Sequence, residues 1–186
     1  MIGRKVGEEK LRSFLEKLGL LKKIDFELEE IGKPLDFNWD KCKLETVSFG
    51  HGITTTPLQA AAAYASLTNG GYFIDPTLKL KKNLKIINRQ SIISKNTSNQ
   101  INKILRKVVT DKQGTGSFAD IFGYDVGGKT GTAKSYTNGN KNINTFISIF
   151  PTEQPKYVLL VILDDPKAAP HITYNYRGQL IKNISR

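Results

Sequence analysis

Residues 123–133 read Gly-Tyr-Asp-Val-Gly-Gly-Lys-Thr-Gly-Thr-Ala, and strand signals follow from this point onward. The segment Lys129 to Tyr136 predicts a first strand, which ends at a turn rich in glycine and asparagine. Two further strands are predicted at Asn144–Phe150 and Tyr157–Leu163. Because the connections between the strands are short, we expect neighbouring strands to pair in antiparallel fashion.

The sequence before the predicted sheet contains three helical patterns. The first ends at Gly19 and carries apolar residues at helical spacing: Leu11, Phe14, Leu15 and Leu18. The second starts at Thr56-Pro57, an N-cap followed by proline at the first helical position, and ends at Asn69-Gly70-Gly71. The third follows Thr97-Ser98 and has an apolar face formed by Ile101, Ile104, Leu105 and Val108. Helices followed by antiparallel strands indicate an α+β fold.

Length and composition limit the class of protein further. The 186 residues fit one domain of ordinary size, and Cys42 is the only cysteine. An intramolecular disulfide and a multi-cysteine metal site are therefore excluded. The longest apolar run, Tyr157 to Leu163, is far short of the roughly 20 residues that span a bilayer. The first residues show no apolar signal region, so we expect the sequence as written to carry neither a signal nor a membrane anchor.

Positive charge is concentrated in one part of the chain. The net charge is +11, and residues 79–112 hold ten basic groups against the single acid Asp111. Such a stretch can attract a polyanion. However, it lacks interleaved aromatic residues, and lysine outnumbers arginine in the chain. We interpret it as a solvated face and expect no nucleic-acid partner.

Residues 123–130 also match the phosphate-loop pattern G-x-x-x-x-G-K-[ST] letter for letter. In a true phosphate loop a helix begins at the Lys-Thr pair, because its N-terminal amides bind the phosphates. The residues after Thr130 instead include glycines, serine and several threonines, which predict strand and turn. A nucleoside triphosphatase is therefore the weaker alternative.

As a strand, Lys129-Thr130-Gly131-Thr132 has a different chemistry. Alternation places Lys129 and Gly131 on one face and Thr130 and Thr132 on the other. At the border of a cleft, Gly131 would let an extended substrate approach the backbone closely. The lysine would add positive charge, and the hydroxyl groups could bind a carboxylate. The alternative is an ordinary strand end.

Several blocks together resemble class B penicillin-binding proteins, most closely the division-specific septal branch. The blocks are Ser48–Gln59, Gly114–Gly116, Gly123–Ala133 and Phe146–Lys167. They follow the family's order and span about residues 7–167. The resemblance implies part of a penicillin-binding/transpeptidase fold of the serine β-lactamase-like kind, with helices and an antiparallel sheet. It also implies peptidoglycan cross-linking by serine acyl transfer, which β-lactams inhibit by acylating the same serine.

The resemblance assigns roles to individual residues. Lys129 would position neighbouring catalytic groups, and Thr130 and Thr132 would bind the carboxylate of the substrate or of penicillin. The amide of Thr132 would donate to the oxyanion, and Gly131 would leave room for the peptide. Three further residues would lie near the cleft: Ser48, Gly50 and His51. The implied partners are D-Ala-D-Ala stem peptides, β-lactams and cell-division proteins, without a metal or another cofactor.

The sequence departs from the family in its catalytic motifs. None of the ten serines is followed by lysine at the third position, so Ser-x-x-Lys is absent. The only Ser-x-Asn is Ser94-Lys95-Asn96, which we interpret as the lead-in to the third helix. We therefore expect residues 1–186 to form one partial transpeptidase domain, truncated near its C-terminal end. Its nucleophile and the rest of the domain would lie outside this sequence.

Several expectations follow from a partial domain. The chain alone should be inactive, should form no covalent penicillin adduct and should leave apolar faces partly bare. The resemblance places the full-length family at the periplasmic face of the inner membrane. An alternative is a non-catalytic remnant of a split or decayed gene, which sequence alone does not separate from a working half.

Overall fold

The computed structural model describes residues 2–29, 32–35, 39, 43–80, 91–135 and 141–166. The chain forms two compact units, Met1–Ile101 and Asn102–Arg186. Helices dominate the first unit, and the strands lie in the second. The helical elements are α1 (Ile2–Val6), α2 (Glu8–Lys17), α3 (Lys43–Val47), α4 (Pro57–Thr68), α5 (Lys95–Thr110) and a 3-10 turn, Ser117–Ala119. The strands are β1 (Gly127–Ser135), β2 (Lys141–Phe150) and β3 (Tyr157–Asp164).

Helix α2 confirms the first predicted helix and its end. Gly19 follows the helix with a φ of 73°, in the left-handed region that glycine tolerates. The amide of Gly19 bonds to the carbonyl of Glu16 at 2.9 Å, and the amide of Leu20 bonds to that of Leu15 at 3.0 Å. This pattern closes the last turn of the helix and redirects the chain.

Helix α4 begins and ends where the sequence predicted. Thr56 is the N-cap, and its hydroxyl accepts from the amide of Gln59 at 3.2 Å. In return the side-chain oxygen of Gln59 accepts from the amide of Thr56 at 2.8 Å. This reciprocal capping box satisfies two backbone donors that a helix start leaves without intrahelical partners.

Gln59 also joins α4 to the segment that follows α2. Its side chain is buried, with 1% of the residue exposed. The amide nitrogen Nε2 donates to the carbonyl of Gly19 at 2.9 Å and to that of Lys22 at 2.8 Å. One buried side chain therefore caps its own helix and fixes a loop about 40 residues earlier in the chain.

A glycine after α4 connects this helix to the start of α5. Gly71 has a φ of 92°, and its carbonyl accepts from the amide of Ile92 at 2.8 Å. A Cβ on Gly71 would overlap the carbonyl oxygen of Ile93. The close approach and the positive φ both require glycine here.

Helix α5 starts earlier than the sequence predicted. It begins at Lys95, not after Thr97-Ser98, and the hydroxyl of Ser94 accepts from the amide of Thr97 at 3.1 Å. The apolar periodicity begins only at Ile101, so the polar first turn gave no signal in the pattern. Ser94-Lys95-Asn96 was predicted to precede the third long helix, but only Ser94 does so, and Lys95 and Asn96 belong to its first turn.

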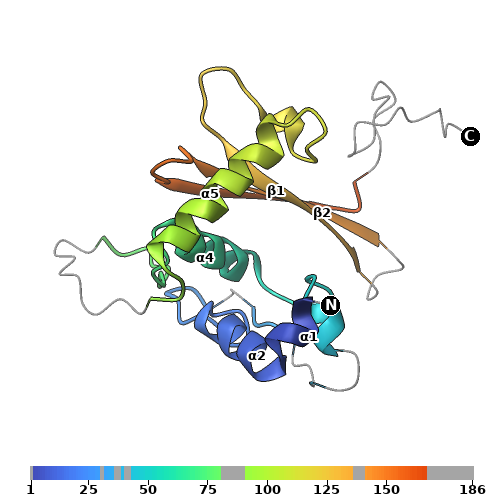
Figure 1. Cartoon of the computed structure of the whole chain (residues 1–186). Coiled ribbons are helices and arrows are strands. Elements are labelled where there is room, and N and C mark those ends of the chain that lie inside the picture. The colour runs from blue at the N-terminus through green and yellow to red at the C-terminus, as the bar shows by residue number, and fades with distance from the viewer. Residues whose placement is uncertain are drawn as a thin grey trace, which may run out of the picture. The chain divides into compact units, whose positions relative to one another are not determined.

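The strands form one antiparallel sheet in the order β1-β2-β3, which confirms the α+β fold class. In the second unit the C-terminal part of α5 lies across one face of this sheet (Figure 1). Four apolar side chains from the helix and the central strand are buried there: Leu105, Val109, Ile147 and Ile149. The sheet is thus anchored by α5 on this face.

Strand β3 leaves much apolar surface uncovered. Leu159 is 51% exposed, Val161 42% and Leu163 52%. Alternation places these three side chains on one face of the strand. Their exposure agrees with the expectation that apolar faces of this chain are partly bare.

Candidate functional site

The predicted site residues Lys129 to Thr132 lie in the middle of β1. Each pairs with a residue of β2, and Lys129 is opposite Ile147 while Thr132 is opposite Asn144. Lys129 and Thr132 are exposed, whereas Thr130 and Gly131 are partly buried. The sheet therefore holds four consecutive residues on a rigid element and leaves a cation and a hydroxyl open to a ligand.

Lys129 and Thr130 are joined by hydrogen bonds. The Lys129 ammonium donates to the Thr130 carbonyl at 2.8 Å and to the Thr130 hydroxyl at 3.4 Å. The Thr130 hydroxyl in turn donates to the hydroxyl of Thr115 at 2.8 Å. An ammonium and two hydroxyls therefore cluster within hydrogen-bonding range, a combination that suits a carboxylate or another anion.

Thr115 is a member of this cluster to which the sequence gave no role. It lies between two glycines in the loop after α5, and a hydrogen bond connects it to a residue 15 positions later. Gly114–Gly116 was noted in the sequence only as one of the blocks that resemble the family, which gave no indication of the partner of Thr115. Only the folded chain brings this loop to the side of β1.

Gly131 has a packing role in addition to the predicted access for substrate. A Cβ at this position would lie 2.5 Å from the hydroxyl oxygen of its strand partner Thr145. That hydroxyl also donates to the Gly131 carbonyl at 3.3 Å. The pairing of β1 with β2 therefore favours glycine at this position before any ligand is considered.

Ser48, Gly50 and His51 belong to the first unit and follow α3. The Ser48 hydroxyl donates to the Glu45 carbonyl at 2.7 Å, and the His51 ring stacks on Phe49 with 6.2 Å between ring centroids. All three predicted residues are exposed. Their assembly with Lys129 into one cleft stays a prediction.

The penicillin-binding protein transpeptidase domain model matches residues 1–186. The chain belongs to this family. A probable peptidoglycan D,D-transpeptidase FtsI from Caulobacter vibrioides is 36% identical over 180 residues, which cover 90% of this chain and 30% of that protein. Stage V sporulation protein D from Bacillus subtilis is 33% identical over 202 residues, which cover all of this chain and 31% of that protein. The resemblance to class B penicillin-binding proteins is thus confirmed.

Solved transpeptidase domains share the fold of this chain. The transpeptidase domain of Burkholderia pseudomallei penicillin-binding protein 3 matches with a TM-score of 0.81 and 26% identity, over 96% of this chain and 54% of that one. Penicillin-binding protein 3 from Mycobacterium tuberculosis, solved in complex with ampicillin, matches with a TM-score of 0.78 and 26% identity, over 97% of this chain and 43% of that one. This chain thus spans about a third of the length of these curated relatives and about half of these solved chains.

The phosphate-loop alternative does not fit the structure. Lys129 and Thr130 lie inside β1, which continues to Ser135, so no helix starts at the Lys-Thr pair. The amides that a helix N-terminus would direct at a phosphate are therefore not formed there. Residues 123–130 therefore match the phosphate-loop sequence pattern without forming the phosphate-loop structure.

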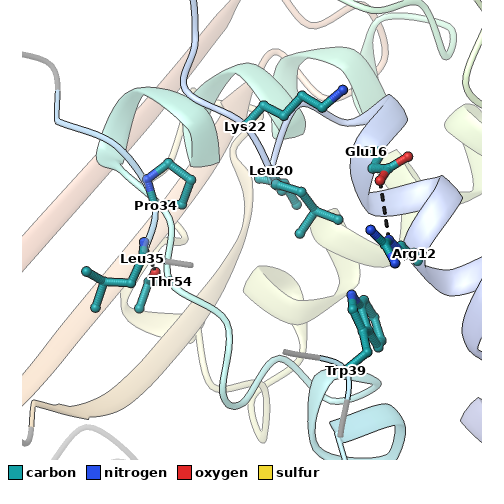
Figure 2. A pocket seen from close by; sticks show the side chains of 9 residues that line it. Arg12, Glu16, Leu20, Lys22, Pro34, Leu35, Trp39 and Thr54 are labelled. Atoms are coloured by element: carbon teal, nitrogen blue, oxygen red, sulfur yellow. Dashed lines mark hydrogen bonds and ion pairs between the residues drawn. The ribbon is translucent and has the colours of Figure 1, made fainter. Parts of the chain in front are cut away.

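The described ranges offer few other candidate sites. They contain no group of three or more residues placed to hold a metal, and none of their helices has the length and apolar character needed to cross a bilayer. A shallow cavity of about 200 Å³ lies in the first unit (Figure 2). Its lining includes none of the predicted site residues: it is formed by Arg12, Glu16, Leu20, Leu21, Lys22, Pro34, Leu35, Trp39 and Thr54.

Proposed function

We propose that this chain supplies the carboxylate-binding strand of a D,D-transpeptidase that cross-links peptidoglycan during septal cell-wall synthesis. The observation that carries the proposal is Lys129-Thr130-Gly131-Thr132 on β1, with the ammonium of Lys129 and the side chain of Thr132 exposed. The sequence match to a D,D-transpeptidase FtsI supports the reaction class and the division branch.

The proposed chemistry assigns one task to each residue. The terminal carboxylate of a D-Ala-D-Ala peptide, or that of a β-lactam, accepts hydrogen bonds from Thr132 and from the hydroxyl pair that includes Thr130. Lys129 contributes a positive charge beside this carboxylate, and Gly131 lets the peptide lie along the strand. The Thr132 amide donates to the oxygen of the attacked carbonyl as negative charge develops on it.

The nucleophile of the proposed reaction is a serine outside these 186 residues, because they contain no Ser-x-x-Lys. Its oxygen attacks the carbonyl carbon of the penultimate D-alanine, and the peptide C–N bond breaks. The last D-alanine leaves with a proton, and the acyl group then passes to an amine of another stem peptide. We accordingly expect catalysis only when that serine segment is present together with this chain.

The test is acylation by a labelled penicillin of a longer product of the same gene that contains Ser-x-x-Lys. We expect Lys129→Ala to slow acylation by about 100-fold, because the variant loses the charge that holds the carboxylate in place, and a misplacement of about 1 Å costs a rate factor of this order. Lys156→Ala, which removes an exposed lysine elsewhere in the same unit, is the matched control and should leave the rate unchanged. Equal acylation rates for the two variants would refute the role of Lys129.

A remnant of a split or decayed gene is the second candidate, and the absence of Ser-x-x-Lys is the observation that favours it. Mapping the 5′ end of the transcript and sequencing it upstream of codon 1 separates the two. An in-frame extension with Ser-x-x-Lys and Ser-x-Asn supports the transpeptidase. A stop codon or frameshift between those motifs and Met1 removes the enzyme claim for this chain.

A further inference from the structure

One arginine joins α5 to the segment that leads into the site strand. The Nη1 atom of Arg106 donates to the carbonyl of Val126 at 2.8 Å and to a carboxylate oxygen of Asp120 at 3.1 Å. Its Nε atom lies 3.2 Å from a carboxylate oxygen of Asp125. All three acceptors lie within the seven residues before β1. Arg106 thus holds the entry to the strand at three points.

The same cluster reaches the turn between β2 and β3. The second carboxylate oxygen of Asp125 accepts from the amide of Thr152 at 2.8 Å. The pKa of Asp125 is lowered, mainly by a hydrogen bond with the Thr152 side chain, to which the backbone hydrogen bonds of Thr152 and Glu153 and the positive charge of Arg106 add. Through Asp125, Arg106 is therefore linked to the turn between β2 and β3, at the same end of the sheet as the start of β1.

The backbone of α5 meets the first residue of β1 directly. A Cβ on Gly127 would lie 2.9 Å from the backbone nitrogen of Arg106 and 3.1 Å from the carbonyl carbon of Leu105. The backbones of strand and helix therefore come close together at Gly127, where a Cβ would also lie 2.5 Å from the methyl group of Thr152. The start of β1 is fixed by backbone contact and, one residue earlier, by the arginine side chain.

We propose that Arg106 is a positioning residue that fixes β1, and with it Lys129 to Thr132, against α5. The part of this inference that concerns a ligand rests on the proposed function. From Val126 to Thr132 the strand runs about 20 Å, at about 3.3 Å per residue. A tilt of about 1.5° at the start then moves Thr132 by about 0.5 Å, the tolerance of a productive site.

The geometry requires arginine and not merely a positive charge. The guanidinium presents Nε and Nη1 in a planar fork toward different acceptors, whereas lysine offers one compact ammonium group. Arg106→Lys keeps the charge but is expected to hold at most part of these contacts. Arg12→Lys is the matched control, because Arg12 is an exposed helical arginine whose partner, Glu16 at 3.4 Å, is one turn away.

The first measurement is amide hydrogen exchange of the ¹⁵N-labelled 186-residue chain, read residue by residue by NMR. In Arg106→Lys we expect exchange to rise at least tenfold at amides 126–132, while the buried core amides of Ile147 and Ile149 keep their protection. Arg12→Lys should change neither group. Unchanged exchange at 126–132 in Arg106→Lys, or an equal rise throughout the second unit, overturns the proposal.

The second measurement uses the longer product of the same gene that contains Ser-x-x-Lys. It compares the affinity for a diacylated L-Lys-D-Ala-D-Ala tripeptide with the affinity for the same peptide carrying a C-terminal amide. We expect the wild type to bind the peptide with the free carboxylate more tightly than the amidated peptide. In Arg106→Lys the ratio of the two affinities should fall about tenfold. If the wild type binds neither peptide, the proposed function fails, whereas loosened amides 126–132 still support Arg106. If Arg106→Lys does not fold, Asp120→Asn replaces it: faster exchange confined to 126–132 supports the proposal, and wild-type exchange there overturns it.

Discussion

Replacement of Gln59 tests how the first unit is held together. Gln59→Met keeps a similar volume in the buried position but removes both the side-chain donor and the acceptor. Three hydrogen bonds are lost: those to the carbonyls of Gly19 and Lys22, and the one from the amide of Thr56. The helix start and the loop after α2 both lose a partner.

The size of the effect follows from these bonds. A neutral intramolecular hydrogen bond contributes a net ~0.5–1.5 kcal/mol, so three together amount to about 3 kcal/mol of the free energy of unfolding. Typical domains are stable by only about 5–15 kcal/mol, so this loss is large. Because Gln59 is 1% exposed, water does not replace the lost partners without opening the structure.

A second substitution at the same position adds a pH signature. Gln59→Glu places a carboxyl group against two carbonyl oxygens, which raises its pKa in the folded state. When the pKa of a carboxyl group is higher in the folded state than in the unfolded state, its protonated form stabilises the fold. For glutamate this stabilisation is complete below the unfolded-state pKa of about 4.3 and is lost as the pH rises through the folded-state pKa. Gln59→Glu should therefore be destabilised more at pH 7 than at pH 4, unlike Gln59→Met.

Urea denaturation and amide exchange of α4 measure these effects. Gln100→Met, which replaces an exposed glutamine of α5, is the control and should stay within about 0.5 kcal/mol of the wild type. A Gln59→Met chain as stable as that control would refute the argument. So would a Gln59→Glu chain whose loss of stability relative to the wild type is the same at pH 4 and at pH 7.

Three further predictions concern the second unit and the proposed reaction. Incubation of the 186-residue chain alone with a β-lactam should give no stoichiometric increase in mass, because Lys129 and the threonines cannot replace an activated serine; a one-to-one adduct would contradict this. The pKa of Asp125 is lowered by its hydrogen bond to Thr152, so its contribution to stability is present above the ordinary aspartate pKa of about 3.9 and is lost as the pH falls below it. Asp125→Asn should therefore flatten the acid limb of the stability curve, and an unchanged acid limb would count against the bond. Gly128→Ala should destabilise the sheet by ~1–3 kcal/mol, because its Cβ would lie 2.8 Å from the Ile147 carbonyl oxygen and 2.6 Å from the Phe146 ring; thermal unfolding would show the loss, and a wild-type melting temperature would exclude the overlap.

Local signals predicted the elements that local chemistry determines. Thr56-Pro57 fixed the start of α4 and Gly19 the end of α2, since a cap and a left-handed residue act within one turn. The strands and their antiparallel pairing followed from alternation and short connections. The predicted start of α5 was wrong because the first turn of this helix is polar, so the apolar pattern gave no indication of the cap at Ser94.

Contacts between distant residues could not be predicted from the same patterns. Gln59 was an ordinary helical residue in the sequence, yet its amide bonds to carbonyls 37 and 40 positions earlier. Arg106 differed in no way from other basic residues of its helix until the fold brought Asp120, Asp125 and Val126 to it. The site strand itself was predictable because its four residues are consecutive, whereas Thr115 was not.

Because a side chain at Gly71 would overlap its neighbours, the pattern of nucleotide changes at codon 71 should show whether selection still acts on the folded protein. Any nucleotide change that replaces glycine there forces a side chain into the Ile93 carbonyl and into an unfavourable backbone conformation. In a population whose cells still depend on the folded product, replacement alleles at codon 71 should be purged while silent changes persist. In a decaying gene, replacement and silent changes at codon 71 should accumulate at the same rate. Sequencing this codon in natural isolates would therefore show whether selection for the fold has been lost.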